Sequence, residues 1–219
     1  MSRTAAVALV LLAASASASD WPQWRGPARD GRAGLAARAS FPEALTPAWK
    51  VTVGEGHASP VVVGDRVYVF SRVGEDEVLQ ALDLATGHSS WRASYPAPYT
   101  MNPAATSHGK GPKSTPAVAG GRIFTFGIDG VLSAFDAAGG RLAWRKELGA
   151  ELGQASPLYG VAQSPVIEGG SLIVHVGGPG KGALTAFDAS TGAVRWAWKG
   201  DGPPTRRRSW PLSAVCDRS

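Results

Sequence analysis

A unit that occurs three times constrains the fold of this chain more than any other feature. Each copy contains a Ser/Thr-Pro dipeptide, an aspartate after an apolar residue, a turn ending in glycine, and a tryptophan. The aspartate precedes the tryptophan by eight residues in every copy, and the proline precedes the expected second strand by six. Intervals that stay constant in three copies predict a repeat architecture in which each copy folds alike. The copies run from Ser59-Pro60 to Trp91, from Thr115-Pro116 to Trp144, and from Ser164-Pro165 to Trp196.

Each copy divides into four short strands. In the first copy, stretches rich in β-branched and aromatic residues lie at 60–63, 66–70 and 78–82, and a fourth strand contains Trp91. Proline is tolerated at the start of a strand because it need not donate a ladder hydrogen bond there. The aspartate and glycine of the third turn supply a side-chain acceptor and a positive φ. The strands do not alternate cleanly between apolar and polar residues, which is typical of a sheet packed on both faces.

These features predict an all-β fold, a β-propeller of four-stranded antiparallel blades at about 57–95, 113–148 and 162–199. A stacked β-solenoid is the alternative. We expect the tryptophan of each copy to fill the wedge between blades, in equivalent buried positions.

The predicted propeller is incomplete, with about three blades and an N-terminal closing strand around Trp49 to Val53. Its outer sheets would lack neighbours and would leave apolar residues facing water, because a repeat buries both faces only between two others. The residues expected there are Val67, Val69, Ile123 and Phe124.

The first nineteen residues have the features of a secretory signal peptide. Arg3 gives a positive start, residues 5–14 form a short apolar run, and Ala16-Ser17-Ala18 offers a small-residue cleavage site. A buried N-terminal helix is the alternative. The run is too short to span a bilayer and no later stretch is long enough, so we expect no membrane span. These features predict a periplasmic or secreted protein with the organisation 1–19 signal peptide, 20–56 N-terminal segment and closing strand, 57–202 blades, and 203–219 aberrant tail.

The net charge of +5 does not indicate a nucleic-acid partner. Four arginines and one aspartate after residue 202, together with Arg3, account for four of the five charges, so the repeats are nearly neutral. Cys216 is the single cysteine, so no internal disulfide can stabilise the fold.

The tail at 203–219 differs from the repeats in composition. Three consecutive arginines, at 206–208, stand where the next Ser-Pro strand opening is due. Codons read two bases later could encode small and aliphatic residues there, with a proline near position 208. We therefore expect a frameshifted or truncated reading frame after Gly202, with a native, solvated basic tail as the alternative.

The repeat resembles a known family. The succession of Ser-Pro, Phe/Leu-Asp, Thr-Gly and Trp is similar to that of the pyrroloquinoline-quinone (PQQ)-like repeat propellers. The opening Asp20-Trp21-Pro22-Gln23-Trp24-Arg25-Gly26-Pro27 resembles exported bacterial members of that family. The resemblance covers about residues 20–202 and implies a propeller of the kind that commonly closes with eight blades.

The resemblance to quinone-dependent dehydrogenases of the family does not extend to their site residues. Those enzymes hold the quinone with calcium ligands, a catalytic aspartate and commonly adjacent cysteines. This chain has no adjacent cysteine pair and no His/Cys cluster with metal-ligand spacing, and the repeated aspartates have a structural role in the turns. We expect no catalytic residue, no metal site and no cofactor, and PQQ is suggested by the family name alone.

Two long connections between blades, 91–116 and 144–165, are the expected place for a binding site. The first contains His108, Lys110 and Lys113. Their cationic groups and the backbone N–H groups of the glycine-rich loop could cradle an anion. The alternative is a solvated loop rich in turns.

Two further motifs have ordinary structural interpretations. Residues 178–183, Gly-Pro-Gly-Lys-Gly-Ala, fit the dinucleotide fingerprint, but that fingerprint requires a following helix, whereas the repeat predicts a strand. We therefore expect a hairpin loop there. Trp21, Trp24 and Arg25 could stack on a ligand, or could pack the N-terminal segment against the propeller, which is favoured.

Two functions follow from these features. The favoured one is a non-enzymatic periplasmic or secreted binding or scaffold module, like the family propeller that assists outer-membrane protein assembly, with other proteins of the cell envelope as partners. The alternative is the N-terminal part of a quinone-dependent dehydrogenase whose ligands lie in further blades.

Overall fold

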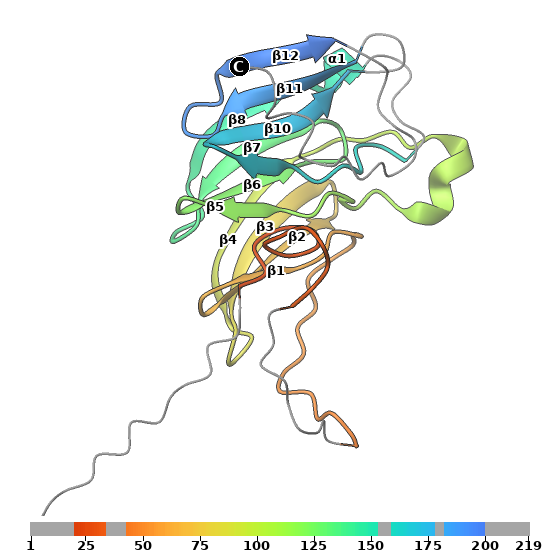
Figure 1. Cartoon of the computed structure of the whole chain (residues 1–219). Coiled ribbons are helices and arrows are strands. Elements are labelled where there is room, and N and C mark those ends of the chain that lie inside the picture. Colours follow the sequence, from red (N-terminus) through yellow and green to blue (C-terminus); the bar gives the residue numbers. More distant parts are fainter. Residues whose placement is uncertain (1–19, 34–42, 153–158, 178–181, 200–219) are drawn as a thin grey trace, which may run out of the picture.

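The computed structural model describes residues 20–33, 43–152, 159–177 and 182–199. It consists of three four-stranded antiparallel sheets stacked face to face in chain order (Figure 1), and the incomplete all-β propeller is confirmed. The first blade contains β1 (Val61–Val63), β2 (Arg66–Val73), β3 (Asp76–Asp83) and β4 (Ser89–Pro96). The second contains β5 (Ala117–Ala119), β6 (Arg122–Phe126), β7 (Val131–Asp136) and β8 (Leu142–Glu147). The third contains β9 (Val166–Glu168), β10 (Ser171–Val176), β11 (Ala183–Asp188) and β12 (Val194–Lys199).

The constant intervals of the repeat correspond to constant positions in the sheets. The second strand of every blade begins six residues after the proline, and the third ends at the repeated aspartate, as predicted. The tryptophan of each fourth strand pairs with an alanine of the third, in the pairs Ala81 with Trp91, Ala134 with Trp144 and Ala186 with Trp196. A shift in register follows that alanine in every blade, so all three blades have the same irregularity.

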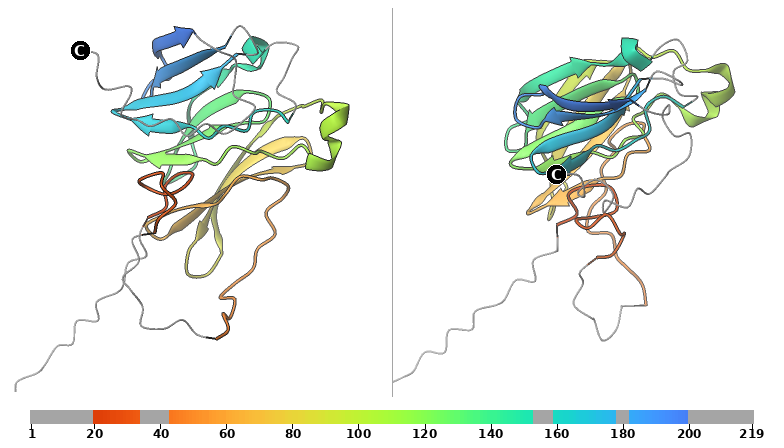
Figure 2. Two further views of the ribbon diagram at one scale, coloured as in Figure 1. Left: turned by 45° about the vertical axis from the view of Figure 1, so that its right-hand side comes forward. Right: turned by 45° about the horizontal axis from the view of Figure 1, so that its top comes forward.

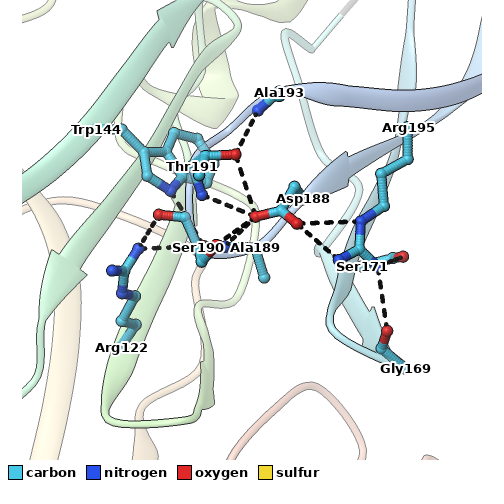
Figure 3. A network of polar contacts seen from close by, with 10 residues as sticks. All are labelled: Arg122, Trp144, Gly169, Ser171, Asp188, Ala189, Ser190, Thr191, Ala193 and Arg195. Atoms are coloured by element: carbon cyan, nitrogen blue, oxygen red, sulfur yellow. Dashed lines mark hydrogen bonds and ion pairs between the residues drawn. The ribbon is translucent and has the colours of Figure 1, made fainter.

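The repeated aspartate holds the turn between the third and fourth strands. In the last blade, Asp188 Oδ1 accepts hydrogen bonds from the backbone N–H groups of Ser190 and Thr191, both at 2.9 Å (Figure 3). Its Oδ2 forms an ion pair of 2.6 Å with Arg195. Hydrogen bonds from Ser190 and Arg195 hold the pKa of this carboxyl well below its usual range, because they favour the charged form. The structural role predicted for the turn aspartates is therefore seen.

Neighbouring blades are joined at their outer strands by an indole ring and a glycine. Trp91 Nε1 donates to Ala137 O at 3.2 Å, and Trp144 Nε1 donates to Ala189 O at 3.1 Å (Figure 3). Each ring lies on the glycine that ends the neighbouring turn, and a Cβ atom added to Gly192 would approach Trp144 to 2.9 Å. The small residue is therefore required as a seat for the ring as well as for its positive φ of 73°.

The seat on the first blade is filled by Trp49, which precedes the first strand. Its Nε1 donates to Leu84 O at 2.9 Å. The ring and Val53 pack on the apolar face formed by Val67, Val69 and Leu82. The segment at 49–53 was expected to be a closing strand that finds no partner in this chain, and within the described part of the chain it forms no strand and pairs with no sheet. This packing explains why Val67 and Val69 are 6% and 8% exposed, so the expectation that they face water is wrong.

The face left open is on the third blade. Trp196 has the same register as Trp91 and Trp144, but it is 39% exposed, and Trp198 beside it is 57% exposed. The prediction of three equivalent buried tryptophans is thus correct in register and wrong in burial, since no described segment lies on that face of β12. Ile123 and Phe124 belong to the middle blade and are buried on both sides, so the expectation that they are exposed is also wrong.

The remaining predictions about chain organisation fall partly outside the described residues. The leader at 1–19 and the tail at 203–219 lie outside them, as does most of the glycine-rich loop. The strands on either side of that loop pair directly, with Val176 opposite Ala183. The loop therefore joins two strands of a hairpin, and a strand and not a helix follows it. No helix in the described ranges is both long and apolar enough to span a membrane.

Candidate functional site

The two ends of the blades differ in their connections. We call the end with the short turns at 83–88, 136–141 and 188–193 the turn end. The other end carries the long connections at 97–116 and 148–165, and we call it the loop end (Figure 1). Variable loops on a rigid sheet framework are the usual place for binding residues, so the candidate site lies at the loop end.

The first long connection is an ordered structure. It contains the 3-10 helix η1 (Pro103–His108), whose first turn is capped by Asn102 Oδ1 accepting from Ala104 N at 3.0 Å. Proline at the first position suits a helix start because its missing N–H is not needed there. The helix ends at Gly109, which has a positive φ of 62°. His108 therefore occupies a fixed place at the end of a turn.

The residues just before β1 hold this connection in position. The backbone N–H groups of His57 and Ala58 both donate to Pro112 O, at 2.7 and 3.1 Å, and His57 Nε2 lies 3.0 Å from His108 O. Gly111 lies directly on this backbone, and a Cβ atom there would be 2.5 Å from Glu55 O. The close approach explains the glycine in the loop.

The three residues singled out from the sequence, His108, Lys110 and Lys113, lie together in this loop, but they do not form one cluster of free cations. Lys110 Nζ forms an ion pair of 3.3 Å with Glu75, and this contact lowers the pKa of the Glu75 carboxyl. Lys113 Nζ donates to Gly109 O and Gly111 O at 3.1 and 3.4 Å, and burial lowers its pKa. Both ammonium groups thus stabilise the loop itself, and anion binding by them stays a prediction.

Sequence reasoning missed two residues that the structure places beside His108. Tyr159, from the second long connection, packs edge to face on the His108 ring with 4.7 Å between centroids. The His57 ring lies 6.5 Å from the His108 ring. All three side chains are exposed, Tyr159 by 43%. We call His57, His108 and Tyr159 the loop patch. The signal that could have found His57 is its place just before the repeated Ser-Pro dipeptide, where the chain enters an innermost strand.

The dipeptide itself links the blades at their inner strands. The N–H of Ser59 donates to Thr115 Oγ1 at 3.1 Å, and the N–H of Thr115 donates to Ser164 Oγ at 3.0 Å. The hydroxyls of Thr115 and Ser164, each of which precedes a repeated proline, therefore accept from the previous blade. This bond accounts for Ser or Thr at that position and fixes the backbone on which His57 is carried.

The described residues do not fit a calcium-bound quinone. Within the described ranges there is no group of three or more His, Cys, Asp or Glu side chains that could hold a metal ion, and there is no cysteine. The repeated aspartates are engaged in their turns; Asp83 Oδ1, for example, accepts from Ala85 N and Thr86 N. The loop patch can instead offer imidazole and phenol groups for stacking and hydrogen bonding on a backbone that is already ordered.

The comparisons with known proteins agree on one family of repeat proteins. A sequence model of the family described as outer membrane protein assembly factor BamB matches residues 46–107 and 97–218. The chain is 24% identical over 176 residues to the outer membrane protein assembly factor BamB of Yersinia pestis, with 78% of this chain and 40% of that protein covered. It is 27% identical over 158 residues to the quinohemoprotein alcohol dehydrogenase ADH-IIG of Pseudomonas putida, with 68% of this chain and 20% of that protein covered.

A solved structure agrees with these matches. The quinohemoprotein alcohol dehydrogenase from Comamonas testosteroni has a TM-score of 0.58 and 26% identity, and the similarity covers 85% of this chain and 28% of that one. The chain therefore spans less than half the length of each of these relatives. Three blades, the constant register and the family match lead to one conclusion: the chain belongs to the family of PQQ-like repeat propellers described as outer membrane protein assembly factor BamB.

Proposed function

We propose that the chain is the propeller part of a non-enzymatic scaffold that binds another protein of the cell envelope through its loop end. The observation that carries this proposal is the loop patch, in which His57, His108 and Tyr159 are exposed on an ordered backbone. Aromatic side chains with a polar group are enriched where proteins bind one another. The two lysines of the loop are already engaged, Lys110 with Glu75 and Lys113 with two carbonyl groups, which favours a neutral protein surface over an anionic small molecule.

The proposal includes export. The leader at 1–19 has the composition of a signal peptide, and the relative from Yersinia pestis is by name a factor in outer membrane protein assembly. We propose that the mature protein begins near Asp20 and works in the periplasm or outside the cell.

The binding surface can be tested by site-specific photo-cross-linking in cells that express the full gene product. A photoreactive residue at Tyr159 is expected to give a discrete adduct with an envelope protein, and the same residue at Ser190, exposed at the turn end, is not. The adduct should be lost when His57 and His108 are both replaced by alanine. Equal labelling from the two positions, or an adduct insensitive to the alanine changes, would contradict the proposal.

A quinone-dependent dehydrogenase is the second candidate, because two of the relatives are quinohemoprotein alcohol dehydrogenases by name. We expect the chain to retain no PQQ after gel filtration in the presence of calcium, since the described residues do not supply a ligand set. Retention of one quinone per chain that depends on calcium would favour the dehydrogenase and overturn the non-enzymatic proposal.

A further inference from the structure

The N-terminal segment at 20–33 contacts the innermost strand of all three blades. Trp21 and Val62 of β1 exchange two backbone hydrogen bonds, at 2.7 and 3.0 Å. The next residue, Pro22, accepts from the N–H of Val118 in β5 at 2.8 Å. In Figure 2 this segment is coloured red and lies against the first blade.

The contact with the third blade is made by a side chain. Arg29 Nη2 donates to Ile167 O in β9 at 2.8 Å and pairs with Glu168 Oε2 at 3.2 Å. Three blades are thus reached within nine residues of chain, from Trp21 to Arg29.

The three contacted residues are equivalent positions of the repeat. Val62, Val118 and Ile167 each lie two residues after the repeated proline, in the middle of the innermost strand. The other edge of each of these strands is paired within its own sheet. The segment therefore binds the same unpaired backbone edge, at the same register, in three successive blades.

The segment is folded to present these groups. Arg25 and Gly26 have positive φ values of 64° and 79°, and the N–H of Gly31 donates to Arg25 O at 2.9 Å to close a tight loop. Gln23 Oε1 accepts from Arg29 Nε at 3.2 Å, which aims the guanidinium at the third blade.

The start of the segment is fixed as well. Asp20 Oδ1 accepts from the N–H of Gly64, in the turn after β1, at 2.9 Å. The Trp21 ring packs on Gly26, where a Cβ atom would approach it to 2.7 Å. Contacts within the segment or with the blades therefore explain most residues of the motif at 20–27.

We propose that the inner edges of β1, β5 and β9 form one binding surface, which takes peptide backbone at β1 and β5 and an arginine side chain at β9, and that residues 20–33 are its ligand within the same chain. We call this segment the axial strap. It holds three blades in a common register and covers the middle of their innermost strands. The strap is independent of the function proposed above, because none of its residues belongs to the loop patch.

The first test separates the strap from its surface. A variant of the gene product that lacks residues 20–33 is mixed with a synthetic peptide of that sequence. The native peptide is expected to bind with one peptide per chain and to raise the melting temperature. The Arg29→Ala peptide should bind at least about tenfold weaker, because it loses the contacts with the third blade. The Arg32→Ala peptide is the matched control and should bind like the native one, since Arg32 is exposed and, among the described residues, bonds only through its backbone N–H, to Asp30 Oδ1. Failure of the native peptide to bind a folded variant, or equal binding of all three peptides, would overturn the proposal.

The second test needs no deletion and decides the matter if the shortened chain does not fold. In the intact chain, Arg29→Ala is expected to speed amide hydrogen exchange at Val62 and Val118 at least about tenfold relative to Arg32→Ala, since both amides donate to the strap. Exchange at Leu79, within β3, should be the same in both variants. Equal rates at Val62 and Val118 in the two variants would show that the segment does not act as one unit.

Discussion

Glu77 is a fully buried carboxyl group that joins the first two blades. Its Oε1 accepts from Ile128 N at 2.7 Å and its Oε2 accepts from Tyr95 OH at 2.6 Å. The contact with Gly127 leaves no room for a Cβ atom there. Burial raises the pKa of Glu77, and the two hydrogen bonds oppose that shift only in part.

The raised pKa predicts how stability depends on pH. Because the pKa of Glu77 is higher in the folded state than in the unfolded state, its favourable contribution is complete below the usual value of 4.5 and is lost as the pH rises through the folded-state pKa. Glu77→Gln keeps an acceptor for Ile128 N and removes the titration, so the variant should gain stability relative to the wild type as the pH rises above 4.5. Urea unfolding at several pH values measures the difference. For Glu147→Gln, at an exposed site, the free energy of unfolding should depend on pH as it does in the wild type. The same pH dependence in Glu77→Gln would contradict a raised pKa at Glu77.

Gly140 provides a second test, because it combines a positive φ with a ring contact. Its φ is 70° and a Cβ atom there would overlap the Trp91 ring. Gly120 has a similar φ of 56°, but open space surrounds the Cβ position. Gly120→Ala is expected to cost only the conformational penalty of about 1 kcal/mol, whereas Gly140→Ala should cost about 3 kcal/mol because the indole must also move. Chemical denaturation of both variants gives the comparison, and equal losses would show that the ring does not depend on this seat.

At the scale of elements, Trp49 closes the near face of the first blade although it lies outside the strands. It covers Val67, Val69 and Leu82. Truncating a half-buried tryptophan removes much of that cover, so Trp49→Ala is expected to destabilise the fold by about 2 to 3 kcal/mol. Trp198→Ala is the matched control, since that ring is 57% exposed, and should cost less than about 0.5 kcal/mol. If the two variants unfold at the same denaturant concentration, Trp49 has no such role.

The elements themselves were predictable because their signals lie within one repeat. Turn residues and β-branched runs placed the starts of strands at Arg66, Arg122 and Ser171, where the structure has them. Contacts between repeats were less accessible to sequence reasoning, because they depend on which faces meet. The exposed ring of Trp196 and the covered side chain of Val67 are both examples.

The candidate site was predicted only in part for a related reason. His108 was found because its connection is long, but Tyr159 belongs to another connection, and the length of a loop does not say which loops converge. Lys113 was considered as an anion ligand, whereas its ammonium group bonds two carbonyl groups of its own loop. Such local hydrogen bonds depend on backbone geometry that a glycine-rich sequence does not reveal.

For the whole molecule, the open face of the third blade predicts self-association. Val194, Trp196 and Trp198 of β12 are 59%, 39% and 57% exposed on one strand. Exposed apolar side chains gathered in this way favour association with other molecules, and the strand also presents an unpaired edge. The chain of 219 residues is therefore expected to form oligomers or aggregates.

Sedimentation velocity tests this expectation directly. Replacing both Trp196 and Trp198 by serine should shift the distribution towards the monomer, and replacing Val73, exposed by 47% at the end of β2, should not. A version of the chain carrying further blades after residue 202 should be monomeric, because the next blade would cover β12. A monodisperse monomer that melts cooperatively, obtained from the 219-residue chain itself, would contradict this interpretation.

Each boundary between blades is made by a tryptophan from the earlier repeat and a glycine from the later one, as with Trp91 and Gly140. Because every repeat carries one ring and one seat, gaining or losing a whole repeat leaves each ring with a matching seat, wherever in the repeat the genetic breakpoints fall. Unequal recombination can therefore change the number of blades in a single event without a new residue at any boundary. A partial repeat that carries the tryptophan without the glycine, or the glycine without the tryptophan, would leave one of the two without its partner.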